Sequence, residues 1–146
     1  MAAPLYTWSF DCDLFGDRVP KIVPLKASAS LETKVGTAVI ATGGEVDEAT
    51  GTVVLFLGLA AEETAAALSQ GDPIKVALIA PGMVIKGTAD ADADAGSGFS
   101  GKLYDFNADG SLDVADAAGG CLSILRTEDA GLTVYCVVNS ALMAAQ

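Results

Sequence analysis

Side chains that carry oxygen ligands recur at short intervals between residues 105 and 116, in the spacing of a calcium-binding loop. Carboxylate and amide oxygens are the ligands that a hard cation such as Ca²⁺ prefers. Gly110 occupies the sixth position, where such a loop turns sharply. The candidate ligands are Asp105, Asn107, Asp109, Asp113 and Asp116. The pattern predicts either a calcium site or, through its Asn-Ala-Asp-Gly turn, a β-hairpin.

The residues after this loop favour the hairpin. The calcium loops of EF-hand and dockerin modules lead into a helix, whereas here Ala117-Ala118-Gly119-Gly120 follows at once. Glycine disfavours a helix interior. The pattern also occurs once in the chain, although dockerins carry paired copies. We therefore expect a turn at residues 107–110 between two strands, with a calcium-dependent binding module as the alternative.

Groups that enzymatic catalysis usually employs are missing from the sequence. There is no histidine among the 146 residues, which removes the commonest general base and zinc ligand. Cys12 lies between Asp11 and Asp13, whose negative charges raise a thiol pKa and make a poor nucleophile. Asp47 and Glu48 are adjacent and would point to opposite faces of a strand. We therefore expect a protein that is not an enzyme and that has no cofactor apart from the calcium of the alternative.

The charge balance limits the classes of partner. The chain has 19 acidic and 8 basic residues, a formal charge of −11, whereas phosphate binding needs clustered lysine and arginine. No apolar run approaches the roughly 18 residues of a membrane-spanning helix. Neither a nucleic acid nor a membrane is therefore expected as a partner. The three widely spaced cysteines and the lack of a signal-peptide pattern predict synthesis in a reducing cytoplasm.

The first 20 residues differ in character from the rest of the chain. We expect residues 1–20 to form an extended arm and residues 21–146 to form a single β-rich domain. Aromatic residues alternate with polar ones in the arm, as in a strand with one apolar face. The expected partner contacts of the arm are Leu5, Tyr6, Trp8, Phe10 and Phe15. The arm either caps the core of its own domain as an edge strand or adds to a strand of another protein.

Turn residues and apolar runs predict the elements of the domain. Pro81 and Gly82 suit a type II turn, which predicts a hairpin over residues 71–87. Residues 52–60 are apolar on both faces, as in a central strand. Residues 61–70 contain good helix formers and predict a short helix or a structured loop.

Two final apolar runs, at residues 121–125 and 132–138, predict a last hairpin. Short strands separated by turn signals therefore recur along most of the chain. The expected fold class is mainly β: a single-domain antiparallel β-sandwich or small β-barrel with an extended N-terminal arm and at most one short helix.

The order of these motifs resembles that of a known family. Residues 34–39 precede a Gly-Gly turn, and a strand ends at residues 57–60. Residues 71–76 follow, and then residues 107–112 precede a second glycine pair and the last hairpin. This order resembles the small head decoration, or cement, proteins of tailed bacteriophages, over residues 21–138.

The resemblance implies a structural virion protein rather than an enzyme. Such a protein is made in the host cytoplasm and binds the outside of the phage head, where it stabilises contacts between major capsid subunits. The implied partners are the major capsid protein and further copies of the chain, often as homotrimers. In that family the N-terminal arm commonly pairs with capsid strands, which would employ the aromatic residues of the arm.

Overall fold

The protein has a mainly β fold, as the sequence predicts. The computed structural model describes residues 3–49, 56–64 and 66–138, which form eleven strands and two short 3₁₀ turns but no α-helix. The strands are β1 (Ser9–Asp13), β2 (Lys21–Lys26), β3 (Ala38–Thr42), β4 (Glu45–Glu48), β5 (Phe56–Ala60), β6 (Pro73–Leu78), β7 (Met83–Thr88), β8 (Asp105–Phe106), β9 (Leu112–Asp113), β10 (Leu122–Glu128) and β11 (Thr133–Val138), and the 3₁₀ turns are η1 (Asp94–Gly96) and η2 (Asp129–Gly131). Within these residues no helix has the length and apolarity needed to cross a membrane.

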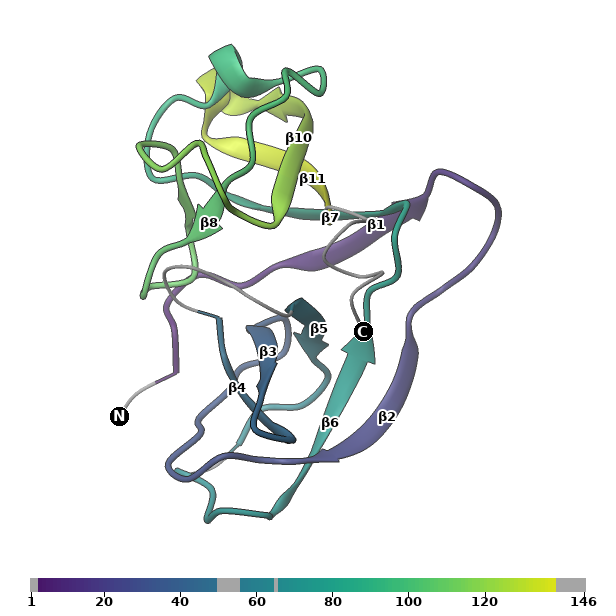
Figure 1. Cartoon of the computed structure of the whole chain (residues 1–146), viewed down its shortest axis with the longest axis vertical. Helices are drawn as coiled ribbons and strands as arrows, with labels where there is room; N and C mark the ends of the chain where they lie inside the picture. Colours follow the sequence, from purple (N-terminus) through teal and green to yellow (C-terminus); the bar gives the residue numbers. More distant parts are fainter. Residues whose placement is uncertain (1–2, 50–55, 65, 139–146) are drawn as a thin grey trace.

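Five strands form a small barrel in the lower half of Figure 1. Their order is β2-β6-β5-β3-β4, and every pair is antiparallel. The two outer strands meet because Ala27, directly after β2, bridges to Val46 of β4, and Ser28 N donates a 2.9 Å hydrogen bond to the Val46 carbonyl. The interior is filled by Ala27, Leu31, Val39, Val46, Ala60, Ile74 and Val76.

A second antiparallel sheet, of order β1-β7-β11-β10, lies above the barrel in Figure 1. The larger hydrophobic core joins this sheet to the barrel and to the β8–β9 hairpin. Three aromatic rings lie at its centre: Phe106 of β8 stacks on Phe56 of β5 at 5.6 Å and meets the edge of Trp8 at 5.4 Å. Trp8 directly precedes β1, and the same core includes Ile85 of β7, so the three sheets share one buried core.

The turn at Pro81-Gly82 forms, but the hairpin predicted around it does not. Gly82 has φ +87°, as a type II turn requires, and Met83 N donates to the Ala80 carbonyl at 3.1 Å. The strands on either side then enter different sheets: β6 pairs with β2 and β5, whereas β7 pairs with β1 and β11. The hairpin prediction is wrong because a turn sequence determines a local reversal of the chain but not the partner of each strand.

The sequence indicates the neighbouring elements with mixed success. Strand β5 lies in the middle of the barrel sheet, as predicted for residues 52–60, of which residues 52–55 lie outside the described part. The described residues of 61–70 form a loop and not a helix. Their backbone pairs with residues 30–33, as in the 2.9 Å hydrogen bond from Leu68 N to the Leu31 carbonyl. The predicted last hairpin is confirmed as β10 and β11.

Candidate functional site

The calcium-loop pattern forms a tight hairpin between β8 and β9. Asp105 pairs with Asp113 across the two strands. Asn107 N donates to the Ser111 carbonyl at 2.8 Å, and Gly110, with φ +90°, donates to the Asn107 carbonyl at 3.0 Å. The predicted turn at residues 107–110 is therefore confirmed.

Side chains of the candidate ligands make hydrogen bonds within and around this turn. Asp109 Oδ1 accepts from the backbone N of Ser111 at 3.0 Å and from its hydroxyl at 2.6 Å, and these bonds lower the pKa of the Asp109 carboxyl. Asn107 Nδ2 donates to Asp90 Oδ2 at 2.9 Å, and Asp113 Oδ1 accepts from the N of Ala115 at 3.2 Å.

The other two candidate ligands lie in different surroundings, since Asp105 is buried and Asp116 is exposed. In the described part of the chain, no group of three or more histidine, cysteine, aspartate or glutamate side chains is placed to hold a metal ion. Calcium binding stays a prediction. If calcium binds, it should raise the melting temperature of the wild type. The melting temperature of Asp109→Ala should then not respond to calcium.

The three cysteine thiols are poor nucleophiles. Burial raises the pKa of Cys121 to about 12 and shifts that of Cys136 in the same direction, since both lie in the larger core. Cys12 is exposed, but desolvation and then its hydrogen bond with Asp11 raise its thiol pKa as well. All three thiols are therefore protonated near neutral pH.

The aromatic residues of the predicted arm divide into buried and accessible side chains. Trp8 is only 3% exposed, and its indole Nε1 donates a 2.7 Å hydrogen bond to the Gly110 carbonyl. Tyr6 and Phe10 are half-buried. Trp8 is thus a core residue of its own chain, as in the alternative in which the arm caps its own domain as an edge strand. Leu5 and Phe15, at 66% and 79% exposure, remain accessible to a partner.

Large exposed hydrophobic side chains gather near the N-terminal end of the described chain. Six of them lie within residues 5–35: Leu5, Leu14, Phe15, Val19, Ile22 and Val35. Only two others occur among the described residues, Phe99 and Leu132. Single exposed hydrophobic residues are ordinary, but six within one segment of the chain make that segment a candidate for contacts with a partner. We therefore take this N-terminal region as the candidate functional site.

The connection between β1 and β2, residues 14–20, is fastened to the Pro81-Gly82 turn. Arg18 donates to both carboxylate oxygens of Asp13, at 2.7 and 2.9 Å, and also to the Pro81 carbonyl at 2.8 Å. Leu14 N donates to the Gly82 carbonyl at 2.8 Å. The Phe15 ring rests on Gly82 so closely that a Cβ there would collide with it. We call residues 14–19, held in this way, the clamped loop.

Acid is expected to loosen the clamped loop. Hydrogen bonds from Arg18 hold the pKa of the Asp13 carboxyl well below its usual range. The ion pair therefore stabilises the fold fully above the unfolded pKa of about 3.9, and this contribution is lost as the pH falls toward the lower folded pKa. Urea midpoints of the wild type should accordingly fall more steeply below about pH 4 than those of Arg18→Met, which lacks the pair.

The comparison should be made at low salt, because the Arg18 side chain is half-exposed and salt screens its attraction to Asp13. For the same reason we expect a modest difference between the two profiles. Parallel pH profiles of the two proteins would contradict a stabilising role for the clamp.

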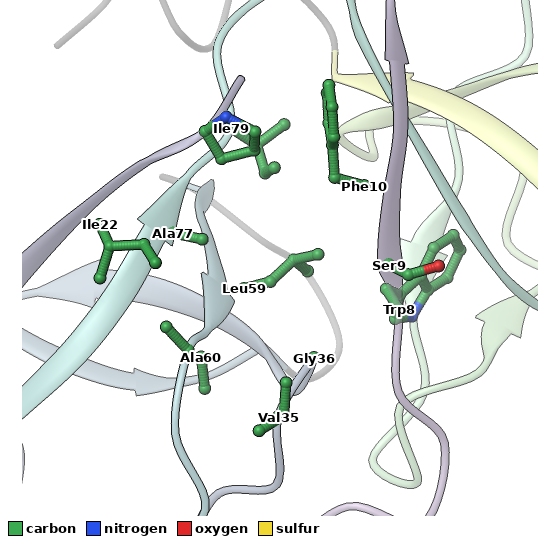
Figure 2. Close-up of a pocket in the computed structure, with 12 residues that line it drawn as sticks. Trp8, Ser9, Phe10, Ile22, Val35, Gly36, Leu59, Ala60, Ala77 and Ile79 are labelled. Atoms are coloured by element: carbon green, nitrogen blue, oxygen red, sulfur yellow. The ribbon is translucent and has the colours of Figure 1, made fainter.

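An apolar pocket of approximately 290 Å³ opens beside β1. Figure 2 shows side chains from β1, β2, β5 and the end of β6 around it, with Phe10, Leu59 and Ile79 pointing toward a common space. Ile22 and Val35 lie at its rim, at 58% and 64% exposure. Sequence reasoning missed this pocket because its lining comes from segments far apart in the chain. The one signal was the alternation of aromatic residues at Tyr6, Trp8 and Phe10, which leads into β1.

Comparison of the sequence with known proteins assigns no family. No protein-family model matches the sequence, and no curated protein matches it.

Among the outer strands of the two larger sheets, β2 and β10 carry residues that discourage pairing with a strand of another protein. Strand β2 contains Pro24, which has no N–H to donate, and begins at Lys21. On β10, the Arg126 guanidinium lies 3.6 Å from the centre of the Tyr135 ring and 3.2 Å from the Glu128 carboxylate. Charged and proline-containing edges resist strand addition. A partner is therefore expected to contact projecting side chains of this protein rather than to pair with β2 or β10.

Proposed function

We propose that this chain is a structural protein that docks onto other protein subunits, specifically a capsid decoration protein of tailed bacteriophages. It binds the outside of the phage head, as a homotrimer, and stabilises contacts between major capsid subunits. The observation that carries the proposal is the concentration of exposed hydrophobic side chains within residues 5–35, on a firmly folded β scaffold. Exposed hydrophobic side chains in this number support contacts with a protein partner.

Two further features support a binding role over a catalytic one. The thiols are held protonated by their surroundings, and the chain has no histidine, so neither a thiolate nucleophile nor an imidazole base is provided. The formal charge of −11 disfavours capture by nucleic acid in an infected cell, where DNA is abundant. A decoration protein needs a stable scaffold and a specific contact surface, and the shared buried core and the exposed hydrophobic side chains support that proposal.

In this proposal Leu5 contacts the capsid. Leu5 precedes β1, and the clamped loop follows β1. Leu5 and the clamped loop therefore lie toward opposite ends of that strand (Figure 1). The Tyr6 N–H donates to the Asp109 carbonyl at 2.8 Å, which fixes the backbone next to Leu5. The Leu5 side chain is therefore presented to solvent from an anchored position, which lowers the entropy lost on binding.

The proposal is tested by cosedimentation with expanded heads assembled from the major capsid protein of the phage that encodes this chain. The wild-type protein is expected to sediment with the heads, and Leu5→Ser is expected to weaken binding at least about tenfold, since burying one leucine side chain contributes roughly 1.5–3 kcal/mol. Leu132→Ser is the matched control, because it removes an exposed leucine outside the N-terminal region.

Wild-type protein that stays in the supernatant contradicts the proposed function. Equal binding by Leu5→Ser and Leu132→Ser contradicts the assignment of Leu5 to the contact.

A further inference from the structure

We propose that the pocket beside the turn of the β8–β9 hairpin binds a small organic cation, a guanidinium group on an aliphatic chain. The pocket has a volume of approximately 340 Å³. It is lined by Tyr6, Thr88, Ala89, Asp90, Asp109, Ser111 and Leu132. The inference goes beyond the proposed function, since binding of the cation does not involve the capsid.

Hydrogen bonds hold the walls of this pocket in place before a ligand enters. The Tyr6 N–H donates to the Asp109 carbonyl at 2.8 Å, and the Ala89 N–H donates to the Leu132 carbonyl at 2.8 Å. Ala89 also forms a bridge to Leu112 of β9. The pocket therefore joins segments that are far apart in the chain yet already ordered. A ligand that enters it causes little loss of conformational entropy in the protein.

The pocket carries negative charge that no basic side chain of its lining neutralises. Asp90 and Asp109 are its two charged residues. Neither makes an ion pair among the residues that the structure describes. Asp109 accepts both bonds from Ser111 through Oδ1, which leaves Oδ2 without a donor from another described residue. The pocket therefore attracts a cation and repels an anion.

Hydroxyl groups beside the carboxylates favour a guanidinium over a metal ion. The hydroxyls of Tyr6 and Thr88 make no hydrogen bond with another described residue. In that same part of the chain, no group of three acidic, histidine or cysteine side chains is placed to hold a metal ion. A guanidinium has five N–H donors in a planar fork, so it can donate to carboxylate and hydroxyl oxygens together.

The less polar part of the lining suits the aliphatic chain of such a cation. Leu132 is 45% exposed and Tyr6 is half-buried, and both line the pocket. Aliphatic chains pack on apolar surface while their charged end stays near polar groups. An aromatic ring also attracts a guanidinium. Since a cavity of about 150 Å³ accepts a benzene molecule, this pocket has room for a guanidinium and a short chain.

The test is a titration of isotope-labelled protein with butylguanidinium, followed by two-dimensional amide NMR in low-salt buffer that contains a chelator. The amide signals of Ala89 and Ser111 are expected to shift and to saturate at millimolar concentrations, as for a ligand of few atoms in a partly open pocket. The signal of Gly43, which does not line the pocket, should stay in place.

Two further ligands identify the group that is recognised. Butylurea has nearly the same shape but no charge, and it should leave the signals unchanged. Butylammonium carries its charge as a compact point with three donors, and it should bind at least about threefold more weakly than butylguanidinium. This comparison of ligands needs no variant of the protein.

Asp109→Asn tests the contribution of the carboxylate. The amide oxygen can still accept the bonds from Ser111, so melting curves should show a folded protein, and binding of butylguanidinium should weaken about threefold or more. Asp17→Asn is the matched control, because it removes the same charge from an exposed residue that does not line the pocket.

A free molecule and the arginine side chain of a partner protein would present the same group. A Gly-Arg-Gly peptide with blocked ends distinguishes these two sources. Binding of the peptide tighter than that of butylguanidinium assigns the pocket to an arginine of a partner, and weaker binding assigns it to a free molecule.

The absence of a saturable shift at Ala89 and Ser111 overturns the inference. Butylurea that binds as tightly as butylguanidinium overturns it too, and so does Asp109→Asn that binds as the wild type does. None of these outcomes concerns phage heads. Wild-type protein that binds butylguanidinium but ignores the heads contradicts the proposed function alone.

Discussion

Replacing Trp8 with alanine is expected to lower the free energy of unfolding by about 3–5 kcal/mol, the usual effect of truncating a large buried aromatic side chain. The indole is 3% exposed and packs edge-on against Phe106 in the shared core. Its Nε1 also satisfies the buried carbonyl of Gly110. The alanine variant loses both the packing and the hydrogen bond. Urea unfolding followed by circular dichroism measures the difference.

The variant Trp8→Phe separates the two contributions. It keeps an aromatic ring but leaves the Gly110 carbonyl without its donor, and we expect an intermediate loss that includes about 1–3 kcal/mol for the unsatisfied carbonyl. Phe15→Ala serves as the control, because that ring is exposed and its removal leaves the core intact. A Trp8→Ala variant as stable as Phe15→Ala would show that the arm is not part of the core.

Replacing Gly87 with alanine is expected to destabilise the protein by about 1–3 kcal/mol through overpacking. Gly87 lies on β7 directly beneath the Trp8 ring, and an added Cβ would collide with three atoms of the indole. Strand β7 is paired on both sides, with β1 and β11, so its backbone has little freedom to move away. The urea midpoint of Gly87→Ala is therefore expected to fall clearly below that of the wild type.

The double variant Trp8→Ala/Gly87→Ala tests this explanation directly. Removing the indole makes room for the new methyl group, so the combined loss should be smaller than the sum of the two single losses. If the two losses of stability add exactly, the destabilisation by Gly87→Ala does not come from a collision with the indole. It would then have another cause, for example weaker pairing of β7.

Local signals in the sequence determine much of the fold, and long-range pairing determines the rest. The Asp-Gly turn at residues 107–110 and the type II turn at Pro81-Gly82 both form, because each depends on the conformations that a few adjacent residues prefer. The hairpin around Pro81-Gly82 fails because β6 and β7 find partners elsewhere. The helix-forming composition of residues 61–70 is overridden by backbone pairing with residues 30–33.

The candidate site was less predictable than the fold. Trp8 and Phe15 are both aromatic residues of the same arm, yet one is buried and the other is the most exposed large hydrophobic residue among those described. Trp8 is buried because its ring fits over Gly87 and its Nε1 donates to the Gly110 carbonyl. Both of these glycines lie far along the chain from Trp8. The clamp from Arg18 to the Pro81 carbonyl is equally remote in sequence, with a separation of 63 residues.

The hydrogen bond between the Trp8 indole and the Gly110 carbonyl spans 102 positions of sequence. A ribosome that has just made residue 8 must add all of these residues before the indole can reach its place. Until then one of the three aromatic rings at the centre of the core is exposed to solvent and to other nascent chains. Closing so long a loop is entropically slow, as in other β proteins rich in distant contacts. The strand made earliest is thus among the last to find its position, and folding is completed late in synthesis or after release.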